Sequence, residues 1–539
     1  MTDSFTTDIA IIGSGVAGAL IAAHLAEKGL KVTILEAGDE VDRSAAVDRY
    51  WSAAIKVPEC PYPPVPQALH PVSDDLDSWY QQTGPDKFAS TYLKTVGGTT
   101  WHWLGTALRL VPNDFEMRTR FGQGQDWPIK YATLSPYYDK AENELGVSGD
   151  GTADLGAPRT TGYPMPAISQ TFLDKAFTSA LEGSAYEVRS TPQARNSKDQ
   201  RDRPACCGNA SCIPVCPVQA KYDATVHVAR ATKAGAVLLS RTNVVALETD
   251  NDNRITAAKF TRWDGSAGSL QARYFVLAAH AIESPRLLLN SASEIIPNGV
   301  ANGSGQVGRN LMDHPTQLSW ALANNPVFPF RGPLSTSGIE NLRDGDFRRL
   351  RGAFRIEIGN DGWSWPTGAP ISTAVDLANQ GLRGKDLDEA LRRQTSRQVR
   401  LASLVEQLPD PDNRVTLDPA KRDMYGIPLP RLSYRIDSYV QAGLAAARTA
   451  HEDIFQRLGV SEMHHSPQPK GAGHIIGTLR MGSDPKTSVV DGDLRSHDHS
   501  NLFVSGSAVF PTSATANPTL TIAALALRLA DTIQSSAQQ

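Results

Sequence analysis

The sequence has few cysteines, and their placement excludes one class of protein. Only five occur among 539 residues; four of them fall between positions 206 and 216, and Cys60 stands alone. A small disulfide-stabilised secreted domain has cysteines spread along the chain in pairs. This distribution predicts no disulfide framework, and the dense group is more typical of a metal site.

The chain also lacks blocks of like charge and long apolar runs. Its net charge of −4 gives no reason to expect nucleic acid or an anionic membrane surface as a partner. The N-terminus has neither the basic segment nor the apolar segment of a signal peptide. The apolar tract near the C-terminus is interrupted by Arg528, too early for it to span a bilayer. The sequence therefore predicts neither a signal peptide nor a transmembrane helix.

The length and the first forty residues indicate the architecture. A chain of 539 residues exceeds what one hydrophobic core supports, so two large domains are expected. Residues 8–13 are typical of a buried strand, residues 14–28 have helical spacing, and residues 31–36 form a second apolar strand. These three segments predict a βαβ unit.

The turn inside this unit carries a dinucleotide-binding fingerprint, Gly13-Ser-Gly15-Val16-Ala17-Gly18. Gly13 allows the tight turn, Gly15 lets the backbone approach a pyrophosphate, and Gly18 lets the helix pack on the strand. Glu36, at the end of the second strand, is placed to accept a hydrogen bond from a ribose hydroxyl. An acidic residue there disfavours a 2′-phosphate, so the pattern favours FAD or NAD over NADP.

The later part of the chain has a different pattern. Residues 226–234, 236–239 and 243–249 indicate a helix and two strands, and residues 274–279 a further buried strand. Residues 316–470 contain alternating segments with a long charged helix between them. The predicted fold class is α/β in the nucleotide-binding part and α+β as a whole: a Rossmann-type domain, then a substrate domain built on an antiparallel sheet backed by helices.

The cysteine group has the spacing of an iron–sulfur site. From Cys206, Asn209 follows after three residues, Cys212 after three more and Cys216 after another four, with Pro217 next. This is the bacterial ferredoxin pattern with one cysteine replaced by asparagine, and a missing ligand suits a cube that lacks one iron.

Three alternatives to a cluster remain open at this stage. A zinc site would need a fourth ligand, for which His227 is a candidate. A disulfide between Cys206 and Cys212 would need oxidation, and the thiols could also be plain buried side chains. We predict a cluster held by Cys206, Cys212 and Cys216. Cys207 breaks the spacing and is the alternative ligand.

Several motifs together resemble the glucose–methanol–choline (GMC) oxidoreductases over nearly the full length. Val96-Gly97-Gly98-Thr99-Thr is a glycine turn that suits contact with a flavin but by itself is also typical of a tight turn beside a buried aromatic. The other motifs begin at Ala281, Val307, His474 and Ala516. The cysteine run, residues 97–103 and residues 126–129 resemble one branch, the catalytic subunits of bacterial FAD-dependent glucose, fructose and gluconate dehydrogenases.

The resemblance implies bound FAD and a hydride taken from a carbinol. It places the catalytic base on His474 and its partner on Asn517, which is also suited to N-cap a helix that begins with Pro518. A neutral imidazole is the usual acceptor of such a hydroxyl proton. Beyond the fingerprint, the cofactor-binding residues that it implies are Gly97, Gly98, Thr99, His102, Val245, Ala279, Ser507, Ala508, Asn517, Pro518 and Thr519.

Other histidines receive different interpretations. Some relatives attach flavin covalently at the position of His102 and others do not, so covalent linkage stays open. Asp313 and His314 are interpreted as structural support around the flavin domain. His497 and His499 flank Asp498 in an expected turn, where a solvated loop is favoured over metal binding.

The resemblance also implies a division of the chain. The FAD-binding domain is expected to comprise residues 1–56, 84–112, 222–315 and 472–539. The substrate-binding domain would comprise residues 57–83, 113–189 and 316–471, and residues 190–221 would form the iron–sulfur loop.

These features predict an FAD-dependent dehydrogenase that oxidises a hydroxyl of a sugar, glycoside or polyol. Electrons would pass through a 3Fe–4S cluster to an external acceptor, a cytochrome subunit, with a small escort subunit. A membrane would be reached only through a partner: the periplasmic face of the inner membrane is favoured, and the cytoplasm is the alternative. Gly473 stands where glucose-oxidising relatives carry Asn, which disfavours glucose itself.

Two other functions remain as alternatives. One is an oxygen-using carbohydrate oxidase similar to pyranose oxidase, with structural cysteines. The other is a non-redox member of the same superfamily, such as a lyase. The presence of both His474 and Asn517 disfavours the non-redox alternative.

Overall fold

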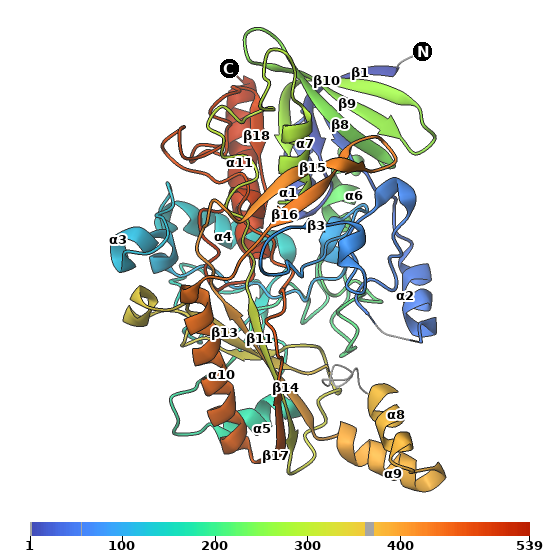
Figure 1. Cartoon of the computed structure of the whole chain (residues 1–539), viewed down its shortest axis with the longest axis vertical. Coiled ribbons are helices and arrows are strands. Elements are labelled where there is room, and N and C mark those ends of the chain that lie inside the picture. Colours follow the sequence, from blue (N-terminus) through green and yellow to red (C-terminus); the bar gives the residue numbers. More distant parts are fainter. Residues whose placement is uncertain (1–2, 55–56, 362–370, 539) are drawn as a thin grey trace.

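Two sheets, one above the other along the long axis of the molecule, organise the chain (Figure 1). This computed structural model describes residues 3–54, 57–361 and 371–538. The predicted fold class is confirmed: a mainly parallel nucleotide-binding sheet and a six-stranded antiparallel sheet backed by helices.

The first sheet has strand order β7-β2-β1-β10-β9-β8, with β18 also paired to β10. Strands β7, β2, β1, β10 and β18 run parallel to one another. Strands β9 and β8 extend the sheet beyond β10 in antiparallel orientation. Helices α1, α11, α4 and α6 pack together beside it. The elements are β1 (Asp3–Ile12), α1 (Val16–Glu27), β2 (Val32–Leu35), α4 (Tyr131–Leu145), α6 (Thr225–Lys233), β7 (Val237–Leu239), β8 (Thr242–Thr249), β9 (Ile255–Arg262), β10 (Ala267–Leu277), β18 (Leu502–Val504) and α11 (Thr519–Gln538).

Helix α1 and the end of β1 show why the glycine turn needs its glycines. Gly13 has a φ of 102°, and a Cβ there would lie 2.5 Å from the carbonyl oxygen of Ala278. A Cβ on Gly18 would lie 2.0 Å from the carbonyl oxygen of Gly13. Gly15, in contrast, faces open space at the N-terminus of α1. The two crowded positions let helix and strands pack closely, and the open position leaves room for a ligand.

The second sheet has strand order β17-β11-β14-β13-β12-β6 and is antiparallel throughout. In β14, Val399, Leu401 and Val405 belong to the core that includes α10 and α5, while the alternate residues face the opposite side. One face of this sheet is therefore apolar and the other is available for a site. The elements are α5 (Phe172–Ala180), β6 (Val188–Ser190), β11 (Thr316–Ala323), β12 (Ser337–Ile339), β13 (Phe354–Gly359), β14 (Gln398–Val405), α10 (Ser438–Leu458) and β17 (Val460–His465).

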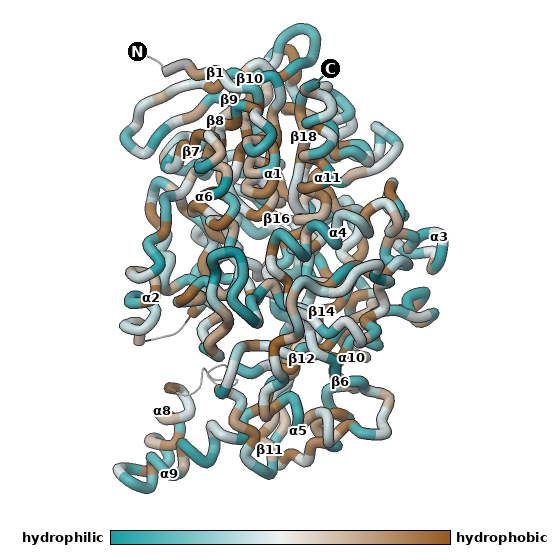
Figure 2. The backbone as a smooth tube through the Cα atoms, turned by 180° about the vertical axis from the view of Figure 1, so that it is seen from behind, coloured by the Kyte–Doolittle hydropathy of each residue, from teal (hydrophilic) through white to brown (hydrophobic). Residues whose placement is uncertain are grey.

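The remaining helices and strands lie outside these two sheets. Figure 2 shows α8 and α9 standing apart from the rest of the molecule, whereas the tube around α1 and β18 inside it is mostly brown. These elements are α2 (Arg43–Ser52), β3 (Gln81–Gln82), α3 (Met117–Phe121), β4 (Ser148–Gly149), β5 (Met165–Pro166), α7 (Glu283–Asn290), α8 (Ile371–Asn379), α9 (Gly384–Thr395), β15 (Arg414–Arg422) and β16 (Pro428–Ser433).

One sequence prediction in this region is wrong. The single long charged helix expected between β13 and β14 is divided into α8 and α9 in the described residues. Gly381, between the two helices, and Gly384, the first residue of α9, have φ values of 95° and 51°, in the left-handed region. Two left-handed residues end one helix and reorient the chain before the next begins.

Candidate active site

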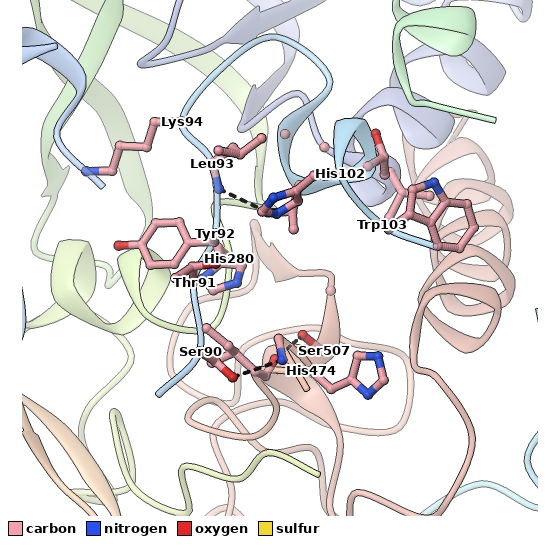
Figure 3. A pocket seen from close by; sticks show the side chains of 18 of the residues that line it. Ser90, Thr91, Tyr92, Leu93, Lys94, His102, Trp103, His280, His474 and Ser507 are labelled. Atoms are coloured by element: carbon pink, nitrogen blue, oxygen red, sulfur yellow. Dashed lines mark hydrogen bonds between the residues drawn. The ribbon is translucent and has the colours of Figure 1, made fainter. Parts of the chain in front are cut away.

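A cavity of about 580 Å³ lies between the two sheets and contains most of the predicted site residues (Figure 3). Three predicted cofactor residues, Gly18, Gly97 and Ala508, are not in its wall. The predicted residues that line it are Gly13, Gly15, Val16, Ala17, Glu36, Gly98, Thr99, His102, Val245, Ala279, His474, Ser507, Asn517, Pro518 and Thr519.

The end of the cavity at α1 has the chemistry of a nucleotide site. The Glu36 carboxylate accepts hydrogen bonds from the Ser14 N–H (3.0 Å), the Ser14 hydroxyl (2.6 Å) and the Gly38 N–H (2.9 Å). Burial raises the pKa of Glu36. The N-terminus of a twelve-residue helix at open Gly15 favours an anionic group. These features fit the phosphates and ribose of a dinucleotide.

The glycine turn at 97 and 98 is tied to the same network. Gly97 and Gly98 have φ values of 91° and 55°, and the Gly97 N–H donates to the Ser14 hydroxyl (3.2 Å). The turn leads to His102, which is buried and whose Nδ1 has no hydrogen-bond partner among the described residues. Burial lowers the pKa of His102 to about 3. In Figure 3, His102 and His474 lie on opposite sides of the pocket.

A hydrogen-bond chain fixes the proton positions at the other end of the cavity. Nε2 of His314 lies 2.8 Å from the carbonyl oxygen of Ala514, and its Nδ1 lies 2.8 Å from Nδ1 of His474. Nε2 of His474 lies 3.2 Å from Nδ2 of Asn517, whose Oδ1 accepts from Arg355 at 3.3 Å.

Only one arrangement of protons satisfies this chain. A carbonyl accepts only, so Nε2 of His314 carries its proton and Nδ1 is the acceptor. His474 must then donate from Nδ1, which leaves the lone pair of its Nε2 toward Asn517 and the cavity. An arginine donates only, so Oδ1 of Asn517 faces Arg355 and its amide N–H faces His474.

Both imidazoles are held neutral. Burial lowers the pKa of His474 well below its usual range, and the neighbouring His314 and Arg355 lower it further. Burial also lowers the pKa of His314 to about 4. At neutral pH, His474 therefore presents an unprotonated nitrogen, as a general base requires.

The backbone around His474 is fixed by Asp313. Its carboxylate accepts the His474 N–H at 3.0 Å and a hydrogen bond from the Ser90 hydroxyl, and burial raises its pKa to about 6. The Gly473 N–H donates to Ser90 at 2.9 Å, and Gly473 has a φ of 73°.

The sequence interpretation of Asp313 and His314 as structural support did not say what they support, and the structure places both beside His474. Both act directly on His474, one through its backbone and one through its ring. Arg355 and Glu357 were missed entirely, since alternation in a strand predicts charged residues on a solvated face.

The wall opposite the nucleotide end is formed by the second sheet. Glu357 of β13 and Arg400 of β14 line the cavity beside Thr316 and Leu318 of β11. Nε and Nη2 of Arg400 bind Asp361 at 3.1 and 2.8 Å. A carboxylate, a guanidinium and a hydroxyl on one wall suit a substrate with several polar groups.

The cysteine residues surround a second, small cavity. Its wall includes Cys206, Cys207, Cys212 and Cys216, with Asn209 and Arg195. The backbone N–H of Gly208 lies 3.4 Å from the sulfur of Cys206, and that of Lys221 lies 3.5 Å from the sulfur of Cys216. Nε of the buried Arg195 has no partner among the described residues. Convergent thiols, backbone N–H donors and one unsatisfied N–H of a buried arginine fit a negatively charged iron–sulfur cluster.

A single zinc ion fits this site less well. Within the described ranges, no three His, Cys, Asp or Glu side chains lie close enough together to hold one metal ion. His227, the candidate fourth ligand, is bound instead to the Tyr222 hydroxyl (2.8 Å) and Glu144 (3.0 Å). Cys207 is exposed, while Cys212 and Cys216 are buried.

Lys221 connects the cysteine loop to the glycine turn. Its ammonium group is buried and donates to the carbonyl oxygens of Thr100 (3.3 Å), Trp101 (2.7 Å) and Trp103 (2.7 Å). Burial lowers its pKa to about 8. Ile213, next to Cys212, also lines the large cavity. The two cavities are therefore neighbours.

The remaining histidine pair has structural contacts. His499 is buried: its Nε2 accepts from the Ala301 N–H (3.0 Å), and its Nδ1 lies 2.7 Å from the Asn253 carbonyl oxygen. His497 contacts the Ser488 hydroxyl (2.9 Å). The solvated loop favoured from sequence is therefore wrong for His499, whose ring ties two segments together.

Comparison with known proteins gives a consistent family assignment. The profile described as GMC oxidoreductase matches residues 67–316 and 409–526, and that described as FAD dependent oxidoreductase matches residues 8–54. The fructose dehydrogenase large subunit of Gluconobacter japonicus is 38% identical, over 100% of this chain and 99% of that protein. The gluconate 2-dehydrogenase flavoprotein of Pantoea cypripedii is 24% identical, over 96% and 92%.

Solved structures show the same fold. Pyridoxine 4-oxidase from Mesorbium loti superposes with a TM-score of 0.63 at 18% identity, covering 98% of this chain and 99% of that one. At this identity the likeness concerns the fold alone.

The depressed pKa of His474 predicts a pH profile for FAD reduction by substrate. A base acts only when unprotonated, so the rate is expected to stay constant from pH 8 to 6.5 and to fall only on further acidification. Anaerobic stopped-flow absorbance across pH 5 to 9 measures this. A decline centred at or above pH 6.5 would contradict the neutral, buried imidazole.

Replacing His314 with Phe tests the hydrogen-bond chain. His474 would lose the acceptor for its Nδ1 proton, so its tautomer would no longer be fixed, and the rate of FAD reduction is expected to fall roughly 10- to 100-fold. His451→Phe is the matched control, because His451 is also buried but, within the part of the chain that the structure describes, its ring bonds to Ser319 and Ser403 rather than to His474. Equal rates in both variants would show that the chain does not control the base.

Proposed function

Because this chain belongs to the GMC oxidoreductase family, FAD-dependent enzymes that act on CH–OH donors, we propose that it is a carbohydrate dehydrogenase. It would oxidise a hydroxyl group of a sugar, glycoside or polyol and deliver the electrons to an external acceptor. The observation that carries this proposal is the unprotonated Nε2 of His474, fixed by its neighbours and directed to a polar-walled cavity.

His474 and Asn517 have different roles in the proposed oxidation. Nε2 of His474 takes the hydroxyl proton of the substrate, and the amide N–H of Asn517 donates a hydrogen bond to the same oxygen as it gains negative charge. FAD, when bound, supplies the hydride acceptor. Asn517 and Pro518 lie just before α11, so the positive end of a twenty-residue helix faces the cavity. This field favours negative charge gathering there.

Carbohydrate is the substrate class favoured by two observations. The names of the relatives, fructose dehydrogenase and gluconate 2-dehydrogenase, point to sugars and sugar acids. The cavity wall supplies Glu357, Arg400 and Thr316, whereas a simple alcohol would need only an apolar pocket. Gly473, without a side-chain amide, continues to disfavour glucose.

We assign the cysteine cavity to a 3Fe–4S cluster held by Cys206, Cys212 and Cys216. The support is the ferredoxin spacing, the shared cavity and the N–H groups directed at two of the sulfurs. A cluster accepts electrons one at a time, which would direct them away from oxygen. The position of Ile213 in the wall of the FAD cavity, and of Lys221 between the cysteine loop and the glycine turn, supports such transfer.

Partners follow from the same proposal. The 38% identical relative is named a large subunit, which favours an assembly containing further subunits. We propose a small escort subunit and a cytochrome acceptor, with any membrane reached through them. Among the described helices, none has the length and apolar content needed to cross a bilayer.

His474→Ala is expected to retain FAD and to lose most flavin reduction. Removing the base should slow reduction by roughly 10²- to 10⁴-fold, since general base catalysis contributes about that factor. The measurement is anaerobic bleaching of the flavin band with a panel of D-fructose, D-glucose, D-gluconate, methyl glycosides and cyclohexanol. Full-rate reduction in the variant would refute the role, and no reduction of the wild type by any carbohydrate would refute the substrate class.

Serine substitutions of the cysteines test the cluster. Cys206→Ser, Cys212→Ser and Cys216→Ser should each lower iron and acid-labile sulfide in anaerobically purified protein and remove the paramagnetic signal of the oxidised form. Cys207→Ser is the control and should keep both. A yellow wild-type protein without iron, producing peroxide in air, would instead indicate an oxidase with structural cysteines.

A further inference from the structure

Two charged residues of β13 lie on the active-site face: Arg355 orients the amide of Asn517, and Glu357 takes no part in the proton transfer described above. Phe354, Ile356 and Ile358 point into the core of the second sheet, so Arg355 and Glu357 occupy its opposite face. Arg355 is fully buried, and Glu357 lines the large cavity. A carboxylate in the wall of a largely buried cavity needs a specific reason.

Arg355 joins Glu357 to the catalytic pair. Its Nε and Nη2 donate to Glu340 at 3.1 and 2.9 Å. Its Nη1 donates both to Oε1 of Glu357 and, at 3.3 Å, to Oδ1 of Asn517. One guanidinium nitrogen therefore places the carboxylate of Glu357 two hydrogen bonds away from the amide that contacts His474.

The second oxygen of Glu357 is left for a ligand. Among the described residues, Oε2 of Glu357 accepts no hydrogen bond, although Oε1 is committed to Arg355. Arg400 is in the same situation: Nε and Nη2 are bound to Asp361, and Nη1 makes no hydrogen bond within the described part of the chain. The wall thus offers one acceptor and one donor beside the base.

We propose that Glu357 is a specificity-determining residue that accepts a hydrogen bond from a second hydroxyl of the substrate, close to the carbinol that is oxidised. This inference rests on the proposed dehydrogenase function and narrows its substrate to neutral polyhydroxylated molecules. A monohydric alcohol would leave Oε2 unsatisfied. A sugar acid would bring a second carboxylate toward Glu357, while the charge of Arg400 is already paired with Asp361.

The expected size of the effect follows from the charge of the acceptor. A site built to bind a substrate hydroxyl discriminates strongly against analogues that lack it, because a buried polar group is then left unpaired. We expect Glu357→Gln to lower kcat/KM about 10- to 100-fold for the sugar that reduces FAD fastest in the panel above.

A cycle of variant and substrate separates binding from folding. The rates of anaerobic FAD reduction are measured for wild type and Glu357→Gln with that sugar and with each of its monodeoxy analogues. For the hydroxyl that Glu357 contacts, the deoxy analogue with wild type and the intact sugar with Glu357→Gln should reduce FAD more slowly by similar factors. The deoxy analogue with Glu357→Gln should be little slower than either single change, because both changes remove the same hydrogen bond. Losses that multiply for every analogue would overturn the proposal.

Glu340→Gln is the matched control. It removes a carboxylate from the same guanidinium, but Glu340 is buried outside the cavity wall. For Glu340→Gln, the factor by which the rate of FAD reduction falls should be the same for the sugar and for each of its monodeoxy analogues. If Glu357→Gln does not retain FAD, Glu357→Asp replaces it in the same set of measurements. Aspartate keeps the negative charge but is one methylene too short to reach the substrate hydroxyl. Failure of every carbohydrate to reduce the wild type refutes the proposed function instead, so the two failures are distinguishable.

Discussion

The active site depends on a chain of hydrogen bonds with a single direction. It starts at the carbonyl of Ala514, passes through His314, His474 and Asn517, and ends at Arg355. Each end is chemically fixed, because a carbonyl only accepts and a guanidinium only donates. The two ends therefore determine every proton between them, and the nitrogen that faces the cavity is the unprotonated one.

The architecture exists to bring these groups together from distant segments. His314 precedes β11, Arg355 belongs to β13, His474 follows β17 and Asn517 precedes α11. The antiparallel sheet supplies one wall and the nucleotide-binding sheet the other, so neither sheet alone contains the site. Burial in this contact region is also what keeps both imidazoles neutral. The same contact between the two sheets thus buries the site and keeps its base unprotonated.

Local features could be predicted from the sequence, and features created by tertiary contact could not. The turn from Gly13 to Gly18 was predictable because steric limits on glycine act within a few residues. The grouping of the cysteines around one small cavity also follows from their closeness in sequence, while the cluster itself stays a prediction. The contact between His314 and His474 spans 160 positions, and no local pattern indicates it. A buried arginine such as Arg355 contradicts the general rule for charged strand residues, and its burial depends on Glu340, which lies outside β13, as well as on Glu357 in the same strand. The remaining assignments, including the domain boundaries, stay predictions.

Lys221 makes the cysteine loop and the turn around His102 one mechanical unit. Its ammonium group bonds to three carbonyls of the turn while its own backbone contacts the sulfur of Cys216. If one segment moved alone, the Lys221 ammonium group would lose its carbonyl acceptors while it stayed shielded from water. This costs more free energy than moving both segments together. The hydrogen bonds of Lys221 therefore hold the cysteine loop and the turn around His102 at a fixed distance when the surrounding protein fluctuates.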